Sequence, residues 1–225
     1  MAESIKAPPR RKQFALPPFP DGGTPTWEIA YLFPAQGTWT EDDYFNLDGI
    51  WEGIPRVELS NGYLEVLPVP TEIHQIIIFV LLQRLAAFTR KHAPGLVLPS
   101  GMRIKLWNRQ FRDADIAYMK AENASRRRKR YWLGADLVME VVSGDAKDIK
   151  RDWETKLREY AKAGIAEYWI VDPEKEVIRV LTLEGKAYKV HGDFGPGTKA
   201  TSVLLPGFTV PVDEVLCPEG ASQED

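Results

Sequence analysis

A run of six residues near the middle of the chain, Leu137 to Val142, is apolar at every position except Glu140. Such a run is typical of a β-strand covered on both faces, because a strand with one solvated face alternates apolar and polar residues. A carboxylate inside a buried strand loses its hydration, which is costly unless a cation, a metal ion or a proton compensates it. The sequence therefore predicts a central strand with one buried acid, Glu140, whose charge must be compensated.

A second acid, Asp115, opens the preceding strand-like run and comes directly after Arg112, Asp113 and Ala114. Adjacent strands could bring its carboxylate beside that of Glu140. Two oxygen ligands from neighbouring strand ends suit Mg²⁺, whose octahedral shell is completed by water and substrate phosphate. The alternative is that Glu140 pairs with a buried arginine and that Asp115 merely lies at a strand end. These two residues alone leave both interpretations open.

A lysine interrupts the inward face of the helix predicted after Glu140. Positions 149, 153, 156 and 160 fall on one stripe at helical spacing, and they read Ile, Trp, Lys and Tyr. A lysine aimed at a metal site could orient the attacking water or stabilise negative charge on a phosphoryl group. The alternative is a lysine that covers apolar surface with its stem while its ammonium stays in water.

The order of predicted elements indicates a mixed α/β domain with one central sheet. A short helix begins near Glu41, and Asn61-Gly62 between two alternating runs predicts a β-hairpin that places Glu58 on a strand. A long core helix with apolar residues from Ile73 to Phe88 ends at Pro94-Gly95. The other predicted elements are strands at Leu96 to Leu98, Met102 to Trp107, Asp115 to Met119, Leu137 to Val142, Tyr168 to Val171, Val177 to Leu183 and Ala187 to His191, and a helix from about Asp148 to Ala163 that Gly164 ends.

The length of 225 residues allows one sizeable core, so we expect one domain. Seven of the 17 prolines lie in the first 34 residues, which predicts an extended or disordered segment over residues 1–38. The predicted domain then spans residues 39–217, and residues 218–225 form an acidic tail.

Composition limits the compartment and the metal chemistry. No stretch approaches the roughly 18 uninterrupted apolar residues of a membrane span, and the first residues lack the apolar core of a signal peptide. We therefore expect a cytoplasmic protein without membrane contact. The single cysteine, Cys217, and the three histidines, His74, His92 and His191, leave little for a zinc site. Oxygen ligands must hold any metal ion.

The formal net charge of −3 argues against a generally basic nucleic-acid coat protein. Five consecutive basic residues nevertheless form one dense group, and a near-neutral body can bind a phosphate backbone through such a group. A solvated loop is the alternative. This basic cluster consists of Arg126, Arg127, Arg128, Lys129 and Arg130.

Several motifs make the sequence similar to a known family. Glu140 lies in Asp136-Leu-Val-Met-Glu-Val-Val-Ser143, which is followed by Asp152-x-x-x-Lys156-x-x-x-Tyr160 and by Ala163-Gly-Ile-Ala-Glu-Tyr-Trp-Ile-Val-Asp-Pro173. These motifs resemble the Uma-type restriction endonuclease family of the PD-(D/E)XK nuclease superfamily, and the resemblance covers roughly Trp39 to Leu216. It extends to Glu58-Leu-Ser-Asn-Gly62, Ala114-Asp115-Ile116 and Ser202-Val-Leu-Leu-Pro-Gly-Phe208.

The resemblance implies a restriction-endonuclease-like fold, with a central mixed β-sheet flanked by helices and an N-terminal β-hairpin. It also implies a metal-dependent endonuclease that hydrolyses DNA phosphodiester bonds and leaves 5′-phosphates. Asp115 and Glu140 correspond to the two metal-binding carboxylates, and Lys156 to the lysine of the superfamily. The implied cofactor is Mg²⁺, which Mn²⁺ could replace, and no organic cofactor is expected.

Two further positions match the family. Glu58 matches an acidic position and would serve as a ligand or orienter at a second metal or at its water; an exposed hairpin glutamate is the alternative. His74 matches a histidine at the start of the long helix and would contact phosphate or water, unless it is a surface or capping residue.

The sequence also departs from the family pattern. Ala114 replaces the usual proline, and Val142 stands where the superfamily often has its lysine, so activity requires that Lys156 reach the site from the helix. The segment from Gly144 to Arg151 is longer than in many members, which leaves the phase of that helix open.

Two other functions stay compatible with the sequence. One is a catalytically inactive module that keeps the nuclease fold and binds DNA or protein. The other is a Mg²⁺-dependent hydrolase of small phosphoesters, which is disfavoured because no glycine-rich phosphate loop of the Walker type is found. DNA is the expected partner, and a homodimer would suit cleavage of both strands.

Overall fold

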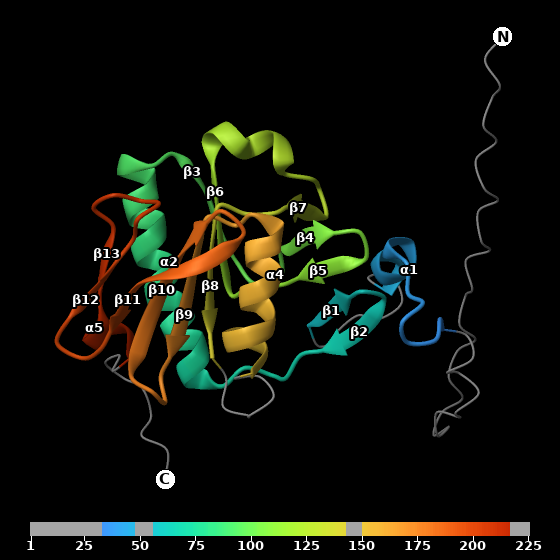
Figure 1. Ribbon diagram of the computed structural model, residues 1–225, viewed down its shortest axis with the longest axis horizontal. Coiled ribbons are helices and arrows are strands. Elements are labelled where there is room, and N and C mark those ends of the chain that lie inside the picture. Colours follow the sequence, from blue (N-terminus) through green and yellow to red (C-terminus); the bar gives the residue numbers. More distant parts are fainter. Residues whose placement is uncertain (1–32, 48–55, 143–149, 217–225) are drawn as a thin grey trace. The chain divides into compact units, whose positions relative to one another are not determined.

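The computed structural model describes residues 33–47, 56–142 and 150–216 (Figure 1). The elements all belong to the unit Ala35–Asp225. The helices are α1 (Glu41–Asn46), α2 (Glu72–His92), the 3-10 helix η3 (Ala121–Arg126), the π-helix η4 (Arg151–Thr155), α4 (Lys156–Ala163) and α5 (Val212–Leu216). The strands are β1 (Val57–Ser60), β2 (Tyr63–Val66), β3 (Gly95–Pro99), β4 (Arg103–Trp107), β5 (Gln110–Arg112), β6 (Ile116–Lys120), β7 (Tyr131–Leu133), β8 (Leu137–Val141), β9 (Glu167–Asp172), β10 (Val177–Glu184), β11 (Ala187–Phe194), β12 (Lys199–Thr201) and β13 (Thr209–Pro211).

The strands form two large mixed sheets and one small sheet. The six-stranded sheet has the order β11-β10-β9-β8-β6-β3, and the five-stranded sheet has the order β2-β1-β5-β4-β7. Strands β12 and β13 pair separately. In each large sheet one pair is parallel, β8 with β9 and β4 with β7, while the other pairs are antiparallel. The mixed α/β class predicted from the sequence is confirmed.

The predicted central mixed sheet is the six-stranded one, and the structure adds a second large sheet, whose origin is a short strand. The predicted strand from Met102 to Trp107 becomes β4, and the chain turns at Arg109, whose φ is 60°, to pair back as β5. Strand β5 is three residues long, Gln-Phe-Arg, which is too short for alternation of polar and apolar residues to predict a strand. Because β5 also pairs with β1, the N-terminal hairpin belongs to a second sheet.

The predicted hairpin is confirmed. Ser60 pairs with Tyr63, which leaves a turn of two residues, Asn61 and Gly62, with φ values of 49° and 87°. Positive φ at both positions is the conformation that favours Asn-Gly in a tight hairpin. Glu58 lies on β1, as expected, and its side chain is buried.

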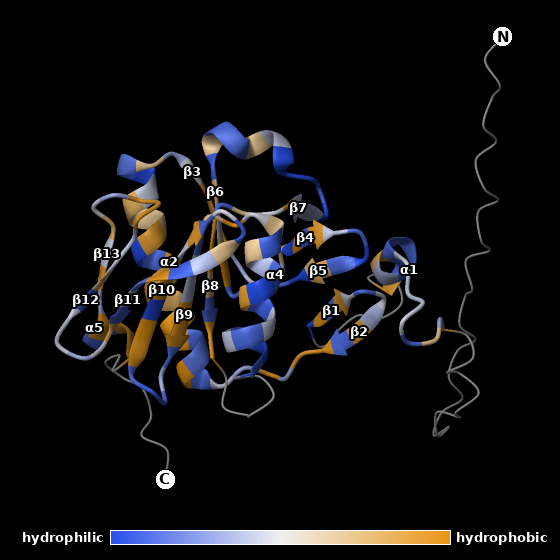
Figure 2. Cartoon of the chain, viewed as in Figure 1, coloured by the Kyte–Doolittle hydropathy of each residue, from blue (hydrophilic) through white to orange (hydrophobic). Residues whose placement is uncertain are grey.

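The six-stranded sheet is covered on both faces. Leu137, Met139 and Val141 of β8 pack in the cluster that contains α2, whereas Val138 and Val142 pack in the cluster that contains α4. Figure 2 shows hydrophobic residues along β8, β9 and β10, in the middle of the fold. Since side chains alternate along a strand, Glu140 points to the same face as Val138, which is the face toward α4.

The predicted long helix is confirmed as α2. Among the described residues, α2 alone has the length and mean hydropathy that would allow a membrane span. Its buried residues Ile77, Leu81 and Leu85 pack against the six-stranded sheet. The expected absence of membrane contact stays a prediction.

The helix predicted from about Asp148 to Ala163 is confirmed where the structure describes it. Its described part contains the π turn of η4, in which the N–H of Lys156 donates to the carbonyl of Arg151, and the helix ends at Gly164, whose φ is 77°. The start near Asp148 and the inward position of Ile149 lie outside the described residues, as do most of the predicted N-terminal segment and the acidic tail. The boundaries 1–38, 39–217 and 218–225 stay predictions.

Glu167, the acid of the Glu-Tyr-Trp-Ile-Val-Asp-Pro motif, has a structural role. Its carboxylate is fully buried and accepts hydrogen bonds from the Trp169 indole at 2.7 Å, from the Ser202 hydroxyl at 2.6 Å and from the N–H groups of Val203 and Leu204. Four donors compensate the lost hydration of this carboxylate. The motif glutamate therefore fastens the loop at 202–204 to β9.

We expect the substitution Glu167→Gln to lower the free energy of unfolding by about 2–3 kcal/mol, because the new amide NH₂ would face donors instead of accepting from them. The measurement is urea unfolding followed by circular dichroism. Glu184→Gln, at an exposed glutamate paired with Lys189, is the control and should change stability by less than about 0.5 kcal/mol. Equal effects of the two substitutions would contradict the role given to Glu167.

Candidate active site

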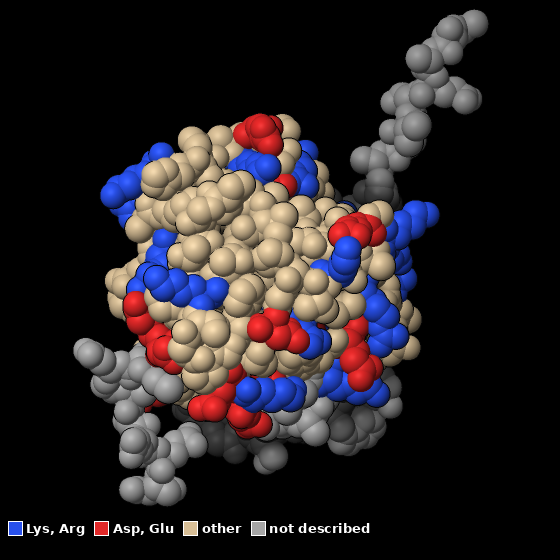
Figure 3. All heavy atoms as spheres, turned by 60° about the vertical axis from the view of Figure 1, so that its left-hand side comes forward, with Lys and Arg blue, Asp and Glu red and all other residues tan. Residues whose placement is uncertain are grey.

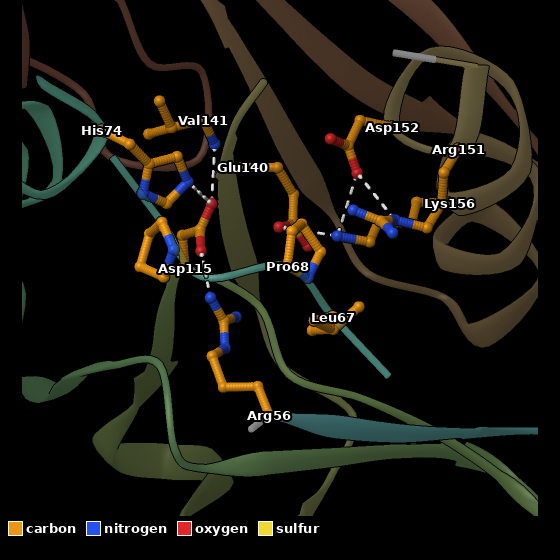
Figure 4. A pocket seen from close by; sticks show the side chains of 11 residues that line it. Arg56, Leu67, Pro68, His74, Asp115, Glu140, Val141, Arg151, Asp152 and Lys156 are labelled. Carbon is orange, nitrogen blue, oxygen red and sulfur yellow. Dashed lines mark hydrogen bonds and ion pairs between the residues drawn. The ribbon is translucent and has the colours of Figure 1, made fainter. Parts of the chain in front are cut away.

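A small cavity lies where the start of β6 and the end of β8 meet the starts of α2 and α4 (Figure 4). Its volume of about 30 Å³ is enough for one or two water molecules. Charged side chains form most of its polar lining. The lining residues are Arg56, Leu67, Pro68, Pro70, His74, Asp115, Glu140, Val141, Arg151, Asp152 and Lys156. Three predicted catalytic residues, Asp115, Glu140 and Lys156, are thus brought together.

Asp115 directly precedes β6 and is 3% exposed. One oxygen, Oδ2, accepts the N–H of Val141 at 2.9 Å and lies 3.2 Å from Nε2 of His74, while Oδ1 accepts from Arg56 at 3.2 Å. Burial alone would raise the pKa of Asp115, but the hydrogen bond of His74 and the charges of His74, Arg56 and Lys156 lower it to about 2. Asp115 is therefore a carboxylate at neutral pH.

Glu140 is less fully compensated. Its Oε2 forms an ion pair with Nζ of Lys156 at 2.8 Å, and its Oε1 accepts the hydroxyl of Tyr160 at 2.5 Å. Burial raises the pKa of Glu140 to about 7, because the negative charges of Asp115 and Asp152 add to the burial effect and outweigh the opposing charge of Lys156. An additional cation beside Glu140 would therefore stabilise its negative charge.

Lys156 reaches the cavity from the first turn of α4, as the sequence required, and it is 3% exposed. Its Nζ lies 2.8 Å from Glu140 and 3.0 Å from Asp152. Burial alone would lower the pKa of Lys156, but the charges of Asp152, Glu140 and Glu58 raise it well above its ordinary value. Lys156 therefore stays positively charged and can donate hydrogen bonds, but it cannot accept a proton.

Two residues of the cavity were missed from the sequence. Asp152 lies one helical turn before Lys156, and this i, i+4 spacing of an acid and a lysine was a signal that could have identified it. Arg56 precedes β1 and donates to Asp113 at 3.0 Å and to Asp115 at 3.2 Å. Its only sequence signal was its position two residues before Glu58, on the same side of the strand.

His74 lies in the first turn of α2 and is 5% exposed. Its Nε2 contacts Asp115, and its buried Nδ1 has no hydrogen-bond partner in the part of the chain that the structure describes. The expected surface or capping alternative does not apply, because the ring is buried at the cavity. A contact to phosphate or water stays a prediction.

Glu58 is not among the cavity-lining residues. Its Oε2 lies 2.6 Å from Nη1 of Arg112, and its Oε1 accepts the N–H of Asp113 at 2.8 Å. Arg112 is 1% exposed and also binds Glu65 and Glu159. In this arrangement Glu58 fixes the segment just before Asp115. Its predicted role at a second metal stays a prediction, whereas the exposed alternative is excluded.

The basic cluster lies at the other end of β6 from Asp115. It comprises the end of η3 and the residues before β7, and the five residues of β6 span roughly 17 Å at 3.3 Å each. Arg126 pairs with Asp136, and Arg130 lies 4.4 Å from the centre of the Phe45 ring. Arg128 and Lys129 are exposed.

The structure therefore does not bring the basic cluster to the cavity, and a role in DNA binding stays a prediction. Elsewhere on the surface, the face in Figure 3 carries lysines and arginines interspersed with aspartates and glutamates. No single sign of charge dominates that face.

The cavity residues fit a hard divalent cation. Among the described residues, no three His, Cys, Asp or Glu side chains form a group that could enclose a metal ion. Mg²⁺, however, is commonly held by one or two carboxylates with water and substrate phosphate, and Asp115 and Glu140 provide two. The incomplete compensation of Glu140 is the observation that favours an added positive charge.

The fold is similar to that of a solved structure. The crystal structure described as "a putative nuclease belonging to DUF820" from Anabaena variabilis ATCC 29413 superposes with a TM-score of 0.62 at 14% sequence identity, over 79% of this chain and 97% of that chain. At this identity the similarity shows the fold alone.

The sequence defines the family. Residues 42–213 match the profile of the Uma2 family, described as "Putative restriction endonuclease", and the chain belongs to this family. The resemblance inferred from the motifs is thereby confirmed. No protein of curated function matches the chain.

The raised pKa of Glu140 predicts a dependence of stability on pH. Glu140 holds its proton in the folded protein up to about pH 7, whereas its ordinary pKa is 4.5. Protonation of Glu140 therefore adds to the free energy of unfolding at low pH. This stabilisation is lost as the pH rises through 7. We expect the stability of Glu140→Gln relative to the wild type to increase by roughly 2–3 kcal/mol between pH 5 and pH 8.

The measurement is urea unfolding at both pH values. Asp193→Asn is the control, because the ion pair with Arg179 lowers the pKa of Asp193, which therefore stays ionised across the range, and Asp193 does not line the cavity. Its stability relative to the wild type should not change between pH 5 and pH 8. A pH-independent difference between Glu140→Gln and the wild type would refute the assigned pKa.

Proposed function

We propose that the protein is a metal-dependent endodeoxyribonuclease whose active site is the cavity at Asp115, Glu140 and Lys156. The observation that carries this proposal is the convergence of two buried carboxylates and one buried lysine on one cavity, in a chain of the Uma2 family. DNA is the proposed substrate. Hydrolysis would add water to phosphorus and break the bond to the 3′ oxygen, which leaves a 3′-hydroxyl and a 5′-phosphate.

Asp115 and Glu140 would hold the cation, Mg²⁺ or Mn²⁺. Such a cation would neutralise phosphate charge and make a water molecule more acidic. Asp115 is held at the cavity by Val141 and His74 at Oδ2 and by Arg56 at Oδ1, and a cation would compete with Arg56 for Oδ1.

Lys156 would supply the fixed positive charge of the site. Because it stays protonated, it would donate hydrogen bonds to the phosphoryl oxygens and stabilise the charge that develops there. A role as the base that takes a proton from water is disfavoured for the same reason. Arg56, which is 24% exposed at the cavity, is a second cation that the phosphate could meet.

A second candidate is a nuclease-fold module that binds DNA without cleaving it. The observation that favours it is the internal pairing of both carboxylates, Asp115 with Arg56 and Glu140 with Lys156. In this case DNA binding would depend on salt but not on Mg²⁺, and Glu140→Gln would leave it unchanged.

The two candidates are separated by calorimetry and by plasmid cleavage. We expect Mn²⁺ to bind to the wild type and not to Asp115→Asn or Glu140→Gln, and of these three proteins only the wild type should nick supercoiled plasmid, and only with metal. Lys156→Met should bind Mn²⁺ but cleave at least about 100-fold more slowly, as is typical when a preorganised charge is lost.

Asp193→Asn is the control. Asp193 lies near the end of β11, does not line the cavity, and forms an ion pair with Arg179 at the surface. It should behave as the wild type in both assays. Metal-dependent nicking by Asp115→Asn at the rate of the wild type would refute the nuclease proposal. Metal-independent DNA binding without nicking would support the second candidate.

A further inference from the structure

The ammonium of Lys156 is shared by two carboxylates. Its Nζ lies 2.8 Å from Oε2 of Glu140 and 3.0 Å from Oδ1 of Asp152. The three side chains are only 4%, 2% and 3% exposed, so both contacts lie in a largely dehydrated part of the site. Figure 4 shows Lys156 between the two acids, with Glu140 on the side of Asp115 and Asp152 on the side of the helix.

The local backbone turns Asp152 inward. The π turn of η4 precedes the regular turns of α4, and Asp152, Lys156 and Tyr160 are all buried at spacings of four residues. The hydroxyl of Tyr168, on β9, donates to the carbonyl of Asp152 at 3.0 Å. The position of Asp152 is therefore set from the helix and from the sheet.

The two carboxylates have different surroundings. The negative charge of Asp115 raises the pKa of Glu140, and Glu140 is the acid that would bind a divalent cation together with Asp115. The ion pairs of Asp152 run to Lys156 and, at 3.7 Å, to Arg151. A divalent cation bound to the carboxylate of Glu140 would weaken the ion pair between Glu140 and Lys156. The ion pair between Asp152 and Lys156 would remain.

We propose that Asp152 is a positioning residue that keeps the ammonium of Lys156 in the cavity when Glu140 serves a bound divalent cation. The inference rests on the proposed nuclease function. Asp152 acts through Lys156 and holds neither the metal nor the substrate.

The first test compares Asp152→Asn with Glu154→Gln. Glu154 lies in the same π turn, but it is exposed and pairs with Arg158. Asp152→Asn should lower kcat for plasmid cleavage by about 10–100-fold, the usual effect of removing a group that orients an active-site residue, and should keep Mn²⁺ affinity within about threefold. Glu154→Gln should match the wild type. Loss of Mn²⁺ binding in Asp152→Asn would make Asp152 a ligand and overturn the proposal, as would unchanged kcat.

The second test repeats both substitutions in a Lys156→Met background. If Asp152 acts through Lys156, Asp152→Asn has no further effect on kcat there, and it lowers the urea midpoint of unfolding only when Lys156 is present. Equal shifts of the midpoint in both backgrounds would overturn the pairing. Absence of cleavage by the wild type, with the coupled midpoints retained, would instead overturn the nuclease function and leave the pairing supported.

Discussion

The ion pair between Lys156 and Glu140 joins the helix and the strand on which the site depends. Helix α4 lies between the two large sheets, and polar contacts fix it on both sides. Lys156 and Tyr160 bind Glu140 of the six-stranded sheet, and Glu159 binds Arg112 of the five-stranded sheet. Burying these charges is costly and is tolerated only because each has a partner. The helix is thereby held in one orientation, which directs its lysine at the end of β8.

Buried acids fall into two groups in this protein. Glu167 and Asp136 are fastened by several donors, and each holds a loop against the sheets. Glu140 is different, because its negative charge adds to those of Asp115 and Asp152 and its pKa rises to about 7. A protein that needed the buried pair of Glu140 and Lys156 only for its fold could replace both residues with well-packed apolar ones without losing stability. The unfavourable free energy of burying the charge of Glu140 therefore indicates that the cavity has a role in a reaction or in binding a ligand.

Much of the fold and of the site could be predicted from the sequence because the periodic signals were long. The apolar run around Glu140, the Asn-Gly turn and the inward position of Lys156 each depend on local rules, and the structure agrees with them. Strand β5 gave no such signal, since it is short and polar, and its pairing with β1 is a tertiary event. Asp152 carried a local signal in its i, i+4 spacing to Lys156, but the predicted inward stripe ran through the next residue, Trp153. The role of Arg56 could not be predicted from local spacing, because its partners Asp113 and Asp115 are distant in the sequence.

The most direct test of the account is the location of a bound cation. A crystal of the wild-type protein soaked in Mn²⁺, with diffraction recorded near the manganese absorption edge, would reveal the metal by its anomalous signal. The account predicts a peak at the cavity, within coordination distance of the carboxylates of Asp115 and Glu140, that is absent from crystals of Glu140→Gln. A peak elsewhere, or none at the cavity with a DNA duplex also present, would contradict it.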